Sequence, residues 1–377
     1  QAQRSRLAQL LAKRSDTLIM LSATPHDGRS ESFASLMNML DSTAIANPHD
    51  YTKDDIKGLC IRRFKKDIRH QIEGVFKERR ISIEKCHASP KEEMAFDVFT
   101  SIQLETDEKD RGAAQLFKTT LEKSLFSSPA ACIKSIDERI RRLERKVGGE
   151  HSHDINALLK LRAALEQITP DSFSRYMGLL DLLLSESYGW NPNNTADRIV
   201  IFTERIETMR YVASHLRKDL DLPKDAIHEL YGGMSDIDQQ RIVEEFGRTE
   251  SPIRILVASD VASEGINLHY LCHRLIHFDI PWSLMVFQQR NGRIDRYGQS
   301  EQPDIRYMMI QSENEKINGD MRILEILVEK EEQATKNIGD PAVLMGVFDI
   351  EEEEKKTANA IESGTPAKDF DLQLSVE

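Results

Sequence analysis

Three arginines stand close together in the last third of the chain, within the stretch Gln289–Gln299. Two of them, Arg293 and Arg296, are three residues apart, so on one turn of helix they would share a face. Guanidinium is a permanent, planar cation that matches phosphate oxygens, and Gly292 allows a close backbone approach. Such a pair could neutralise a departing γ-phosphate. An exposed basic helix with surface ion pairs is the alternative that spacing alone leaves open.

A second stretch with chemical potential is 258–268, directly after an apolar run. Ser259 and Asp260 can exchange hydrogen bonds with a ligand, and Gly265 permits a tight turn. Small and acidic residues at the carboxyl end of a strand are typical of a binding edge. The alternative is an ordinary strand-to-helix loop with a capping Ser or Asp.

The elements that must position these stretches alternate between strand and helix from residue 171 onward. Strands separated by helices imply an α/β fold, with a parallel sheet covered on both faces. Ligands of such sheets bind outside the carboxyl ends of the strands. The expected strands are 198–203, 227–231, 253–259, 274–278 and 305–310, and the expected helices are 173–185, 206–218, 236–246, 284–290 and 317–333.

The rest of the chain follows other patterns. Residues 17–21 form a short apolar run that predicts a buried strand, and residues 81–85 suggest one more strand. Residues 90–170 show helical spacing with almost no glycine, which predicts three or four helices. Beyond residue 349, acidic and small polar residues dominate without periodicity, so we expect a disordered tail.

Composition narrows the function classes. The chain has 377 residues, 40% hydrophobic and 30% charged, with a net charge of -12. This suits a globular protein of two or three domains and argues mildly against a simple nucleic-acid-coating protein. The four cysteines lack metal-ligand spacing, so no metal site is expected, and a reducing cytoplasm fits best. No signal peptide or membrane-spanning run appears, and because the first residue is not Met we expect a fragment of a longer protein.

Together the two stretches resemble the late motifs of superfamily-two helicases, specifically the SWI/SNF-like ATPases. The fifth motif of that family is matched by Asp260, Gly265, Ile266, Asn267 and Leu268. The sixth motif is matched by Gln289, Gly292, Arg293, Arg296 and the ending Gly298-Gln299. Glu264 and Asp295 resemble the bacterial branch that includes the RNA-polymerase-recycling ATPase and the DISARM-type helicases of anti-phage defence.

Earlier segments fit the same family in the same order. Ser22-Ala23-Thr24 resembles the third motif, whose Ser22 and Thr24 would couple two lobes. Residues 61–67 resemble the arginine-lysine segment that closes the first lobe. Residues 200–203 resemble the fourth motif, and residues 231–235 the glycine-containing loop that follows.

The resemblance implies four parts. Residues 1–85 would be the C-terminal end of a first RecA-like lobe, 86–171 a helical insertion, 172–315 a second RecA-like lobe, and 316–377 a helix with an acidic tail. ATP and Mg would bind between the lobes, with Arg293 and Arg296 as arginine fingers. The implied ATP-binding residues are Asp260, Glu264, Gly265, Gln289 and Gly292. The chain lacks the phosphate loop and the Asp-Glu box, so we expect it to be inactive alone, with the magnesium ligands upstream.

The resemblance also implies partners. Duplex DNA is expected to contact Thr203, Gly233, Ser235 and Ser259, although a turn or cap role is an equal alternative for each. The upstream lobe and a protein bound by the insertion are further expected partners. A non-catalytic interaction module and a strand-separating helicase are the rival functions.

Overall fold

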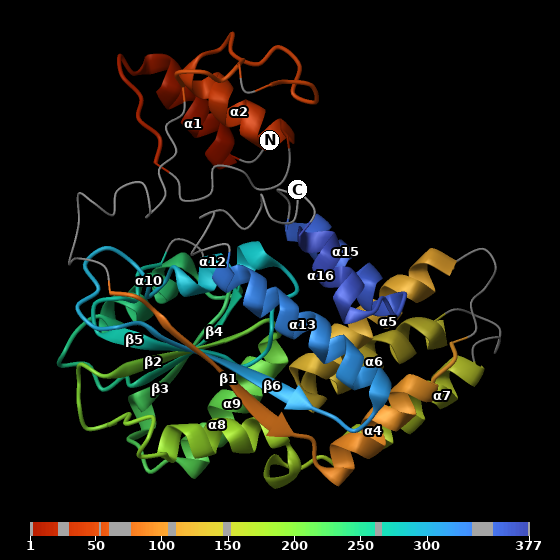
Figure 1. Ribbon diagram of the computed structural model, residues 1–377. Helices are drawn as coiled ribbons and strands as arrows, with labels where there is room; N and C mark the ends of the chain where they lie inside the picture. Colours follow the sequence, from red (N-terminus) through yellow and green to blue (C-terminus); the bar gives the residue numbers. More distant parts are fainter. Residues whose placement is uncertain are drawn as a thin grey trace.

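Two hydrophobic cores of unequal size form in the chain. The computed structural model describes residues 3–21, 30–52, 54–59, 77–104, 111–145, 152–260, 266–333 and 350–375. The smaller core lies in the N-terminal part, where α1 (Gln3–Arg14) and α2 (Ser30–Leu40) stand apart from the sheet (Figure 1). It buries Phe33, Ala34 and Met37 of α2 together with Ile45. The larger core surrounds the sheet.

Residues 17–21 do not form the predicted buried strand. Ile19 and Leu21 are 78% and 92% exposed. Among the described residues, no strand pairs with this segment. A strand needs a neighbour to satisfy its backbone N–H and C=O groups, so an apolar run alone is not sufficient.

The predicted parallel sheet is confirmed. Six strands pair in the order β1-β6-β5-β2-β4-β3, and every pair is parallel. The central strands β2 and β4 are buried along their whole length, as apolar strands covered on both faces should be. The strands are β1 (Arg80–His87), β2 (Arg198–Thr203), β3 (Ile227–Leu230), β4 (Ile255–Ser259), β5 (Cys272–His277) and β6 (Asp304–Gln311).

Strand β1 joins this sheet at its edge. It pairs with β6 over all eight of its residues, from Arg80 opposite Asp304 to His87 opposite Gln311. Arg80 also donates to the Asp304 carboxylate at 2.6 Å. The predicted domain boundary at residue 85 falls inside this strand, because backbone pairing joins residues 80–87 to the C-terminal sheet. The other boundaries stay predictions.

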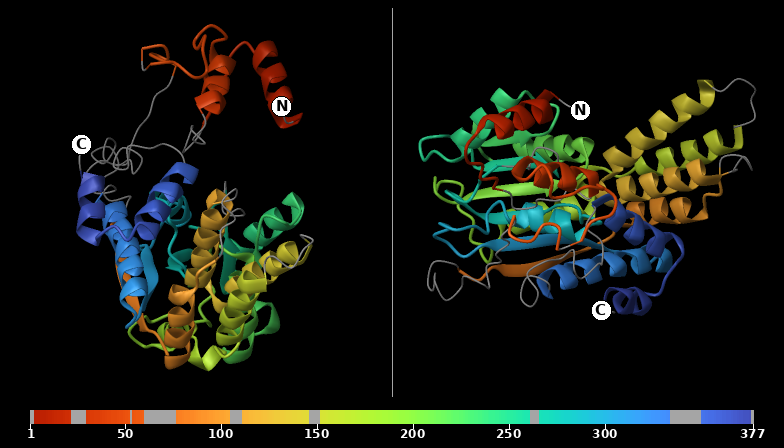
Figure 2. Two further views of the ribbon diagram at one scale, coloured as in Figure 1. Left: turned by 90° about the vertical axis from the view of Figure 1, so that its right-hand side faces the viewer. Right: turned by 90° about the horizontal axis from the view of Figure 1, so that it is seen from above.

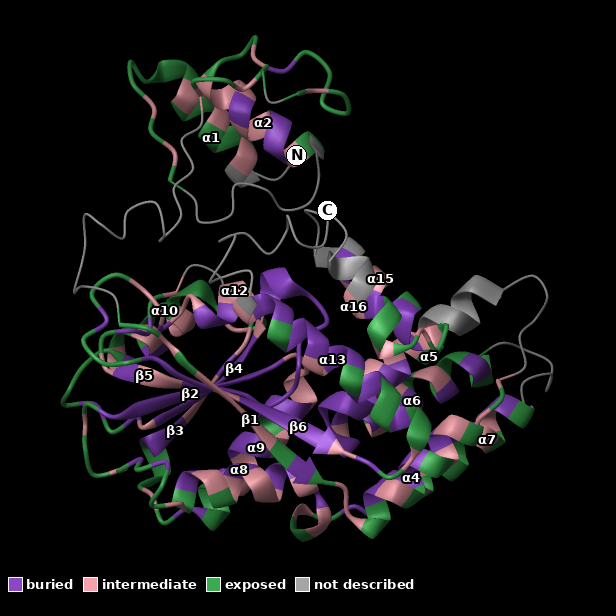
Figure 3. Cartoon of the chain, viewed as in Figure 1, coloured by how far each residue is buried: buried purple, intermediate pink, exposed green. Residues whose placement is uncertain are grey.

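Helices cover both faces of the sheet. On one face lie α8 (Ser174–Leu184) and α9 (Ile206–Asp219), and on the other α10 (Asp236–Phe246), α12 (Leu284–Asn291) and α13 (Glu315–Gln333) (Figure 1). Burial is concentrated in the strands and in the helix faces turned toward them (Figure 3). This layering confirms the expected α/β class. Short 3-10 turns occupy Pro170–Ser172 and Lys224–Ala226.

Four helices form the predicted insertion and extend to one side of the sheet (Figure 2). Ser89 begins the first of them with a capping box, because its side chain accepts from the Glu92 N–H while Glu92 accepts from the Ser89 N–H. Glu92 also accepts from Ser174 of α8, which ties the insertion to the lobe. The helices are α4 (Pro90–Ser101), α5 (Arg111–Ser127), α6 (Pro129–Arg145) and α7 (Ser152–Leu165).

The tail predicted to be disordered instead contains two helices, α15 (Ile350–Glu362) and α16 (Ala367–Ser375). Ile361 and Phe370 are fully buried in the large core. Lys330 of α13 pairs with Asp371 at 2.9 Å. The prediction failed because it relied on the low apolar content of the segment. The few apolar residues recur at helical spacing and pack against the large core.

In the part of the chain that the structure describes, no helix is long and apolar enough to span a bilayer.

Candidate functional site

Polar side chains gather where three neighbouring strands end. β4, β2 and β5 lie side by side in the sheet and finish at Ser259, Thr203 and His277. Asp260 and Asp279 follow the ends of β4 and β5. The carboxyl edge of a parallel sheet is where its ligands bind, and the structure gathers these polar residues at that edge, as the strand ends in the sequence indicated.

Arg290 links the residues that follow β4 and β5 at this edge of the sheet. Its side chain is fully buried, and it donates from Nε and Nη2 to both carboxylate oxygens of Asp260, at 2.5 and 2.7 Å. Nη1 donates to the Asp279 carbonyl at 3.1 Å, and Nη2 lies 3.5 Å from the Asp279 carboxylate. Burial disfavours the charged guanidinium, but the attraction of Asp260 outweighs it and raises the pKa of Arg290. Asp260, predicted to bind ATP, is thus held by an arginine in this structure.

Asp279 links several segments and was missed from the sequence. Its carboxylate accepts from Ser127 Oγ at 2.6 Å, from Thr203 Oγ1 at 2.8 Å and from the Glu204 N–H at 2.9 Å. Ser127 ends α5, so the helical insertion is bonded directly to the sheet edge. An acid immediately after a buried apolar strand, as at Asp260, was the signal that could have identified it.

Arg293 and Arg296 lie in turns beyond the end of α12. The helix expected over residues 284–290 is found as α12, which ends at Asn291, so the two arginines follow it and do not share a helical turn. Arg293 Nη1 donates to the Ile266 carbonyl at 3.2 Å, and Arg296 donates to the Asn267 side chain. The two stretches singled out in the sequence are therefore brought together, and both arginines are partly exposed.

The other residues of the arginine stretch have local roles. Gly292 caps α12, and a Cβ there would lie 3.0 Å from the Gln288 carbonyl, so its close approach is to its own helix. Gly298 has φ +91 and faces His269. Gln299 is buried and donates to the Cys272 and Ile294 carbonyls, which fixes the end of the stretch. Gln289 is partly exposed on α12.

The four residues predicted to contact nucleic acid divide into two pairs. Thr203 and Ser259 are buried, and Thr203 is bonded to Asp279, so neither side chain reaches the surface. Gly233 and Ser235 lie exposed in the loop before α10. Ser235 accepts from the Asp238 N–H at 3.1 Å, so the capping alternative is confirmed for it.

Four predicted site residues fall outside the described ranges: Ser22, Thr24, Glu264 and Gly265.

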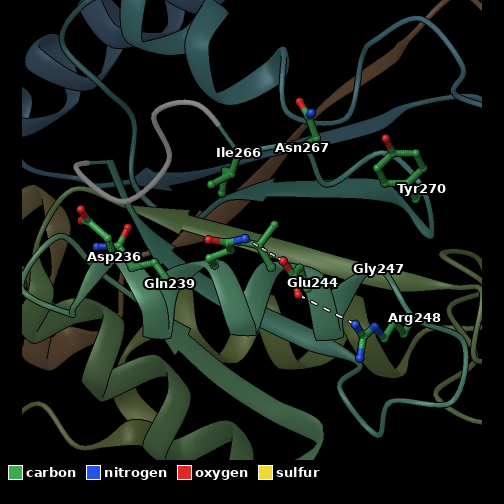
Figure 4. A pocket seen from close by; sticks show the side chains of 10 residues that line it. Asp236, Gln239, Glu244, Gly247, Arg248, Ile266, Asn267 and Tyr270 are labelled. Carbon is green, nitrogen blue, oxygen red and sulfur yellow. Dashed lines mark hydrogen bonds and ion pairs between the residues drawn. The ribbon is translucent and has the colours of Figure 1, made fainter.

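A groove of about 670 Å³ runs between α10 and residues 266–270 (Figure 4). Its polar side chains pair with one another: Gln240 donates to Glu244, and Glu244 lies 3.8 Å from Arg248. Asn267 also lines it. Among the residues predicted to bind ATP, the three that the structure describes, Asp260, Gln289 and Gly292, do not line the groove.

A comparison with protein families decides the nature of this region. Residues 178–298 match the family described as "Helicase conserved C-terminal domain". This part of the chain is a helicase C-terminal domain. The matched residues include β2 to β5, Arg290 with its partners Asp260 and Asp279, and both partly exposed arginines. The resemblance to helicases is confirmed for this region.

Curated relatives extend beyond the helicase C-terminal domain. "Uncharacterized ATP-dependent helicase YqhH" of Bacillus subtilis (strain 168) is 24% identical over 340 residues, which cover 85% of this chain and 55% of that protein. "RNA polymerase-associated protein RapA" of Vibrio parahaemolyticus is 21% identical over 331 residues, covering 78% of this chain and 32% of that protein. The chain thus spans about half of the first relative and a third of the second.

Solved structures give a weaker likeness. The Sulfolobus solfataricus SWI2/SNF2 ATPase core domain is 19% identical and has a TM-score of 0.42, with 94% of this chain and 67% of that chain covered. The parallel strand order, rather than this alignment, supports the fold of the helicase C-terminal domain.

Proposed function

We propose that the chain is the C-terminal part of an ATP-dependent translocase on duplex nucleic acid, in which Arg293 and Arg296 act as arginine fingers. The observation that carries the proposal is the contrast among three neighbouring arginines. Arg290 is buried in a bidentate pair with Asp260, whereas Arg293 and Arg296 are partly exposed; Arg293 donates to the Ile266 carbonyl and Arg296 to the Asn267 side chain. A guanidinium has several donors, so a partly exposed one can also bind phosphate oxygens.

The residues present fit a nucleotide's phosphates in charge. Both arginines project from a segment anchored by Gln299 and by the backbone bond from Leu268 N to the Arg293 carbonyl at 3.1 Å. When bound, ATP would supply the γ-phosphoryl group that is transferred to water. Arg293 and Arg296 would then neutralise the charge that develops on its oxygens. Gln289 would flank them from α12, and magnesium would be held by an upstream lobe of the same protein.

Duplex DNA would contact the exposed loop at Gly233 and Ser235, through backbone N–H groups and a hydroxyl. Thr203 and Ser259 are not retained as contacts, because both side chains are buried. The interaction module without catalysis remains the rival function, and intact arginines speak against it.

The test is ATP hydrolysis by the full-length protein, with and without duplex DNA. Arg293→Ala and Arg296→Ala should each lower kcat by about 10³-fold or more, as for other arginine fingers. Arg142→Ala, a change at an exposed arginine of α6, is the matched control and should leave kcat unchanged. ATP hydrolysis that survives both site changes would refute the assignment. Triplex displacement without strand separation would distinguish a translocase from a strand-separating helicase.

A further inference from the structure

Helix α15, in the C-terminal part of the chain, places one carboxylate at the start of α12. Glu353 is fully buried, and its Oε2 accepts from the Ser283 hydroxyl and, at 3.1 Å, from the Met285 N–H. Ser283 Oγ itself accepts from the Val286 N–H at 3.3 Å. The first turn of α12 is therefore capped twice, once by its own chain and once by a residue about seventy positions away.

Neighbouring contacts hold α15 in this place. One turn beyond Glu353, Thr357 Oγ1 donates to the Trp282 carbonyl at 2.9 Å. Lys123 of the insertion helix α5 pairs with Glu354 at 2.9 Å and lies 5.3 Å from the centre of the Trp282 ring. Three segments distant in sequence thus meet at the residues that lead into α12.

Burying Glu353 has a cost that its packing must offset. Loss of solvent raises the pKa of this carboxyl to about 7, while the hydrogen bonds from Ser283 and Met285 favour its charged form. Its other oxygen, Oε1, has no hydrogen-bond partner among the described residues. A carboxylate at a helix N-terminus is stabilised by the free N–H groups and by the helix dipole. Removing it would leave buried donors unsatisfied at the start of α12.

The cap matters because the arginine-rich stretch begins at the other end of α12. The helix has only eight residues and is about 12 Å long, so its first and last turns are adjacent. Arg290 is in the last turn, and Arg293 and Arg296 follow directly. A shift or fraying of the first turn would therefore be transmitted to all three.

We infer that Glu353 is a positioning residue: by capping α12 from α15, it fixes where Arg293 and Arg296 stand. This inference rests on the proposed function. Helix α15 would then contribute to the position of the two arginines, although Glu353 itself would contact neither nucleotide nor nucleic acid.

The experiment compares Glu353→Ala and Glu353→Gln in the full-length protein. Glutamine keeps an acceptor oxygen for Ser283 and Met285, and alanine does not. We expect Glu353→Ala to lower kcat about fivefold with little change in the KM for ATP, and Glu353→Gln to restore most of it. Glu362→Gln, the same change at a partly exposed carboxylate on α15, is the control.

A second measurement does not depend on activity. Hydrogen exchange at the amides of residues 284–287 should accelerate in Glu353→Ala and stay near the unmodified rate in Glu353→Gln. Unchanged exchange in Glu353→Ala would overturn the cap, and faster exchange with unchanged kcat would overturn the positioning role. If Arg293→Ala and Arg296→Ala keep full activity while exchange responds as expected, the proposed function has failed and the cap has not.

Discussion

The buried centre around Arg290 and the turn segment that follows it have the same arginine-rich sequence but opposite environments. Arg290 gives its donors to Asp260, to the Asp279 carbonyl and to the His277 ring. Arg296, six residues later, is partly exposed and contacts one amide side chain. The difference teaches that the number of arginines in a segment does not reveal what each one does. Arg290 links residues at the carboxyl edge of the sheet, whereas Arg293 and Arg296 lie partly exposed in the turns that follow it.

The largest expected effect that separates the two environments is on stability. Arg290→Ala leaves Asp260 and Asp279 without their buried cation, so the free energy of unfolding should fall by about 3–5 kcal/mol. Arg296→Ala should change it by less than about 0.5 kcal/mol. Denaturant unfolding of the two variants measures both. Equal losses would mean that Arg296 belongs to the structural centre too.

The buried centre should also show a pH effect that the turn segment does not. Burial and the neighbouring charge of Arg290 hold the pKa of His277 well below its usual value. The neutral ring fits its contacts, since Nε2 lies 2.8 Å from Asn291 Oδ1 and Nδ1 lies 3.3 Å from Arg290 Nη1. Only the unfolded chain binds a proton here as pH falls through about 6.5. The stability contribution is therefore complete above that pH and is lost below it, by up to about 1.4 kcal/mol per pH unit.

The measurement is the free energy of unfolding between pH 7 and pH 5. His277→Asn should flatten its decline, whereas His87→Asn, at an exposed histidine of β1, should leave the slope unchanged. Identical slopes for His277→Asn and the unmodified protein would show that the ring does not titrate as described.

The smallest expected effect concerns the partner of Arg296. Asn267→Ala removes the amide that holds the guanidinium, so kcat/KM for ATP should fall roughly three- to tenfold. The free energy of unfolding should change by less than about 0.5 kcal/mol, because Asn267 is exposed. A stability loss as large as that of Arg290→Ala would contradict the separation of the two environments.

The sheet could be predicted because its strands are short apolar runs that need burial on both faces, as residues 199–202 illustrate. The gathering of Ser259, Asp260 and Thr203 at one edge of the sheet followed from the strand ends. The burial of the Arg290 side chain could not be predicted in this way. Phe287, three residues earlier and fully buried, lies on the same face of the helix and was the only local indication. Its carboxylate partners, Asp260 and Asp279, follow the ends of β4 and β5, and the spacing within one motif does not predict a pairing with such distant residues.

The fold of residues 350–375 likewise depends on contacts with distant residues that the local sequence does not predict. Glu353 stands in a run of four acids, which by composition indicates a solvated segment. Its burial depends on the N–H and hydroxyl donors of Ser283 and Met285, which no local pattern connects to it.

The pairing of β1 with β6 sets a limit on how the molecule can be divided. A fragment trimmed to residues 178–298 would lose both strands, and β5 would become an open, apolar edge able to recruit the edge of another chain. During synthesis, residues 80–87 must also wait for more than two hundred further residues before their partner exists. The stretch recognised as a domain by its sequence is therefore smaller than the unit that can fold.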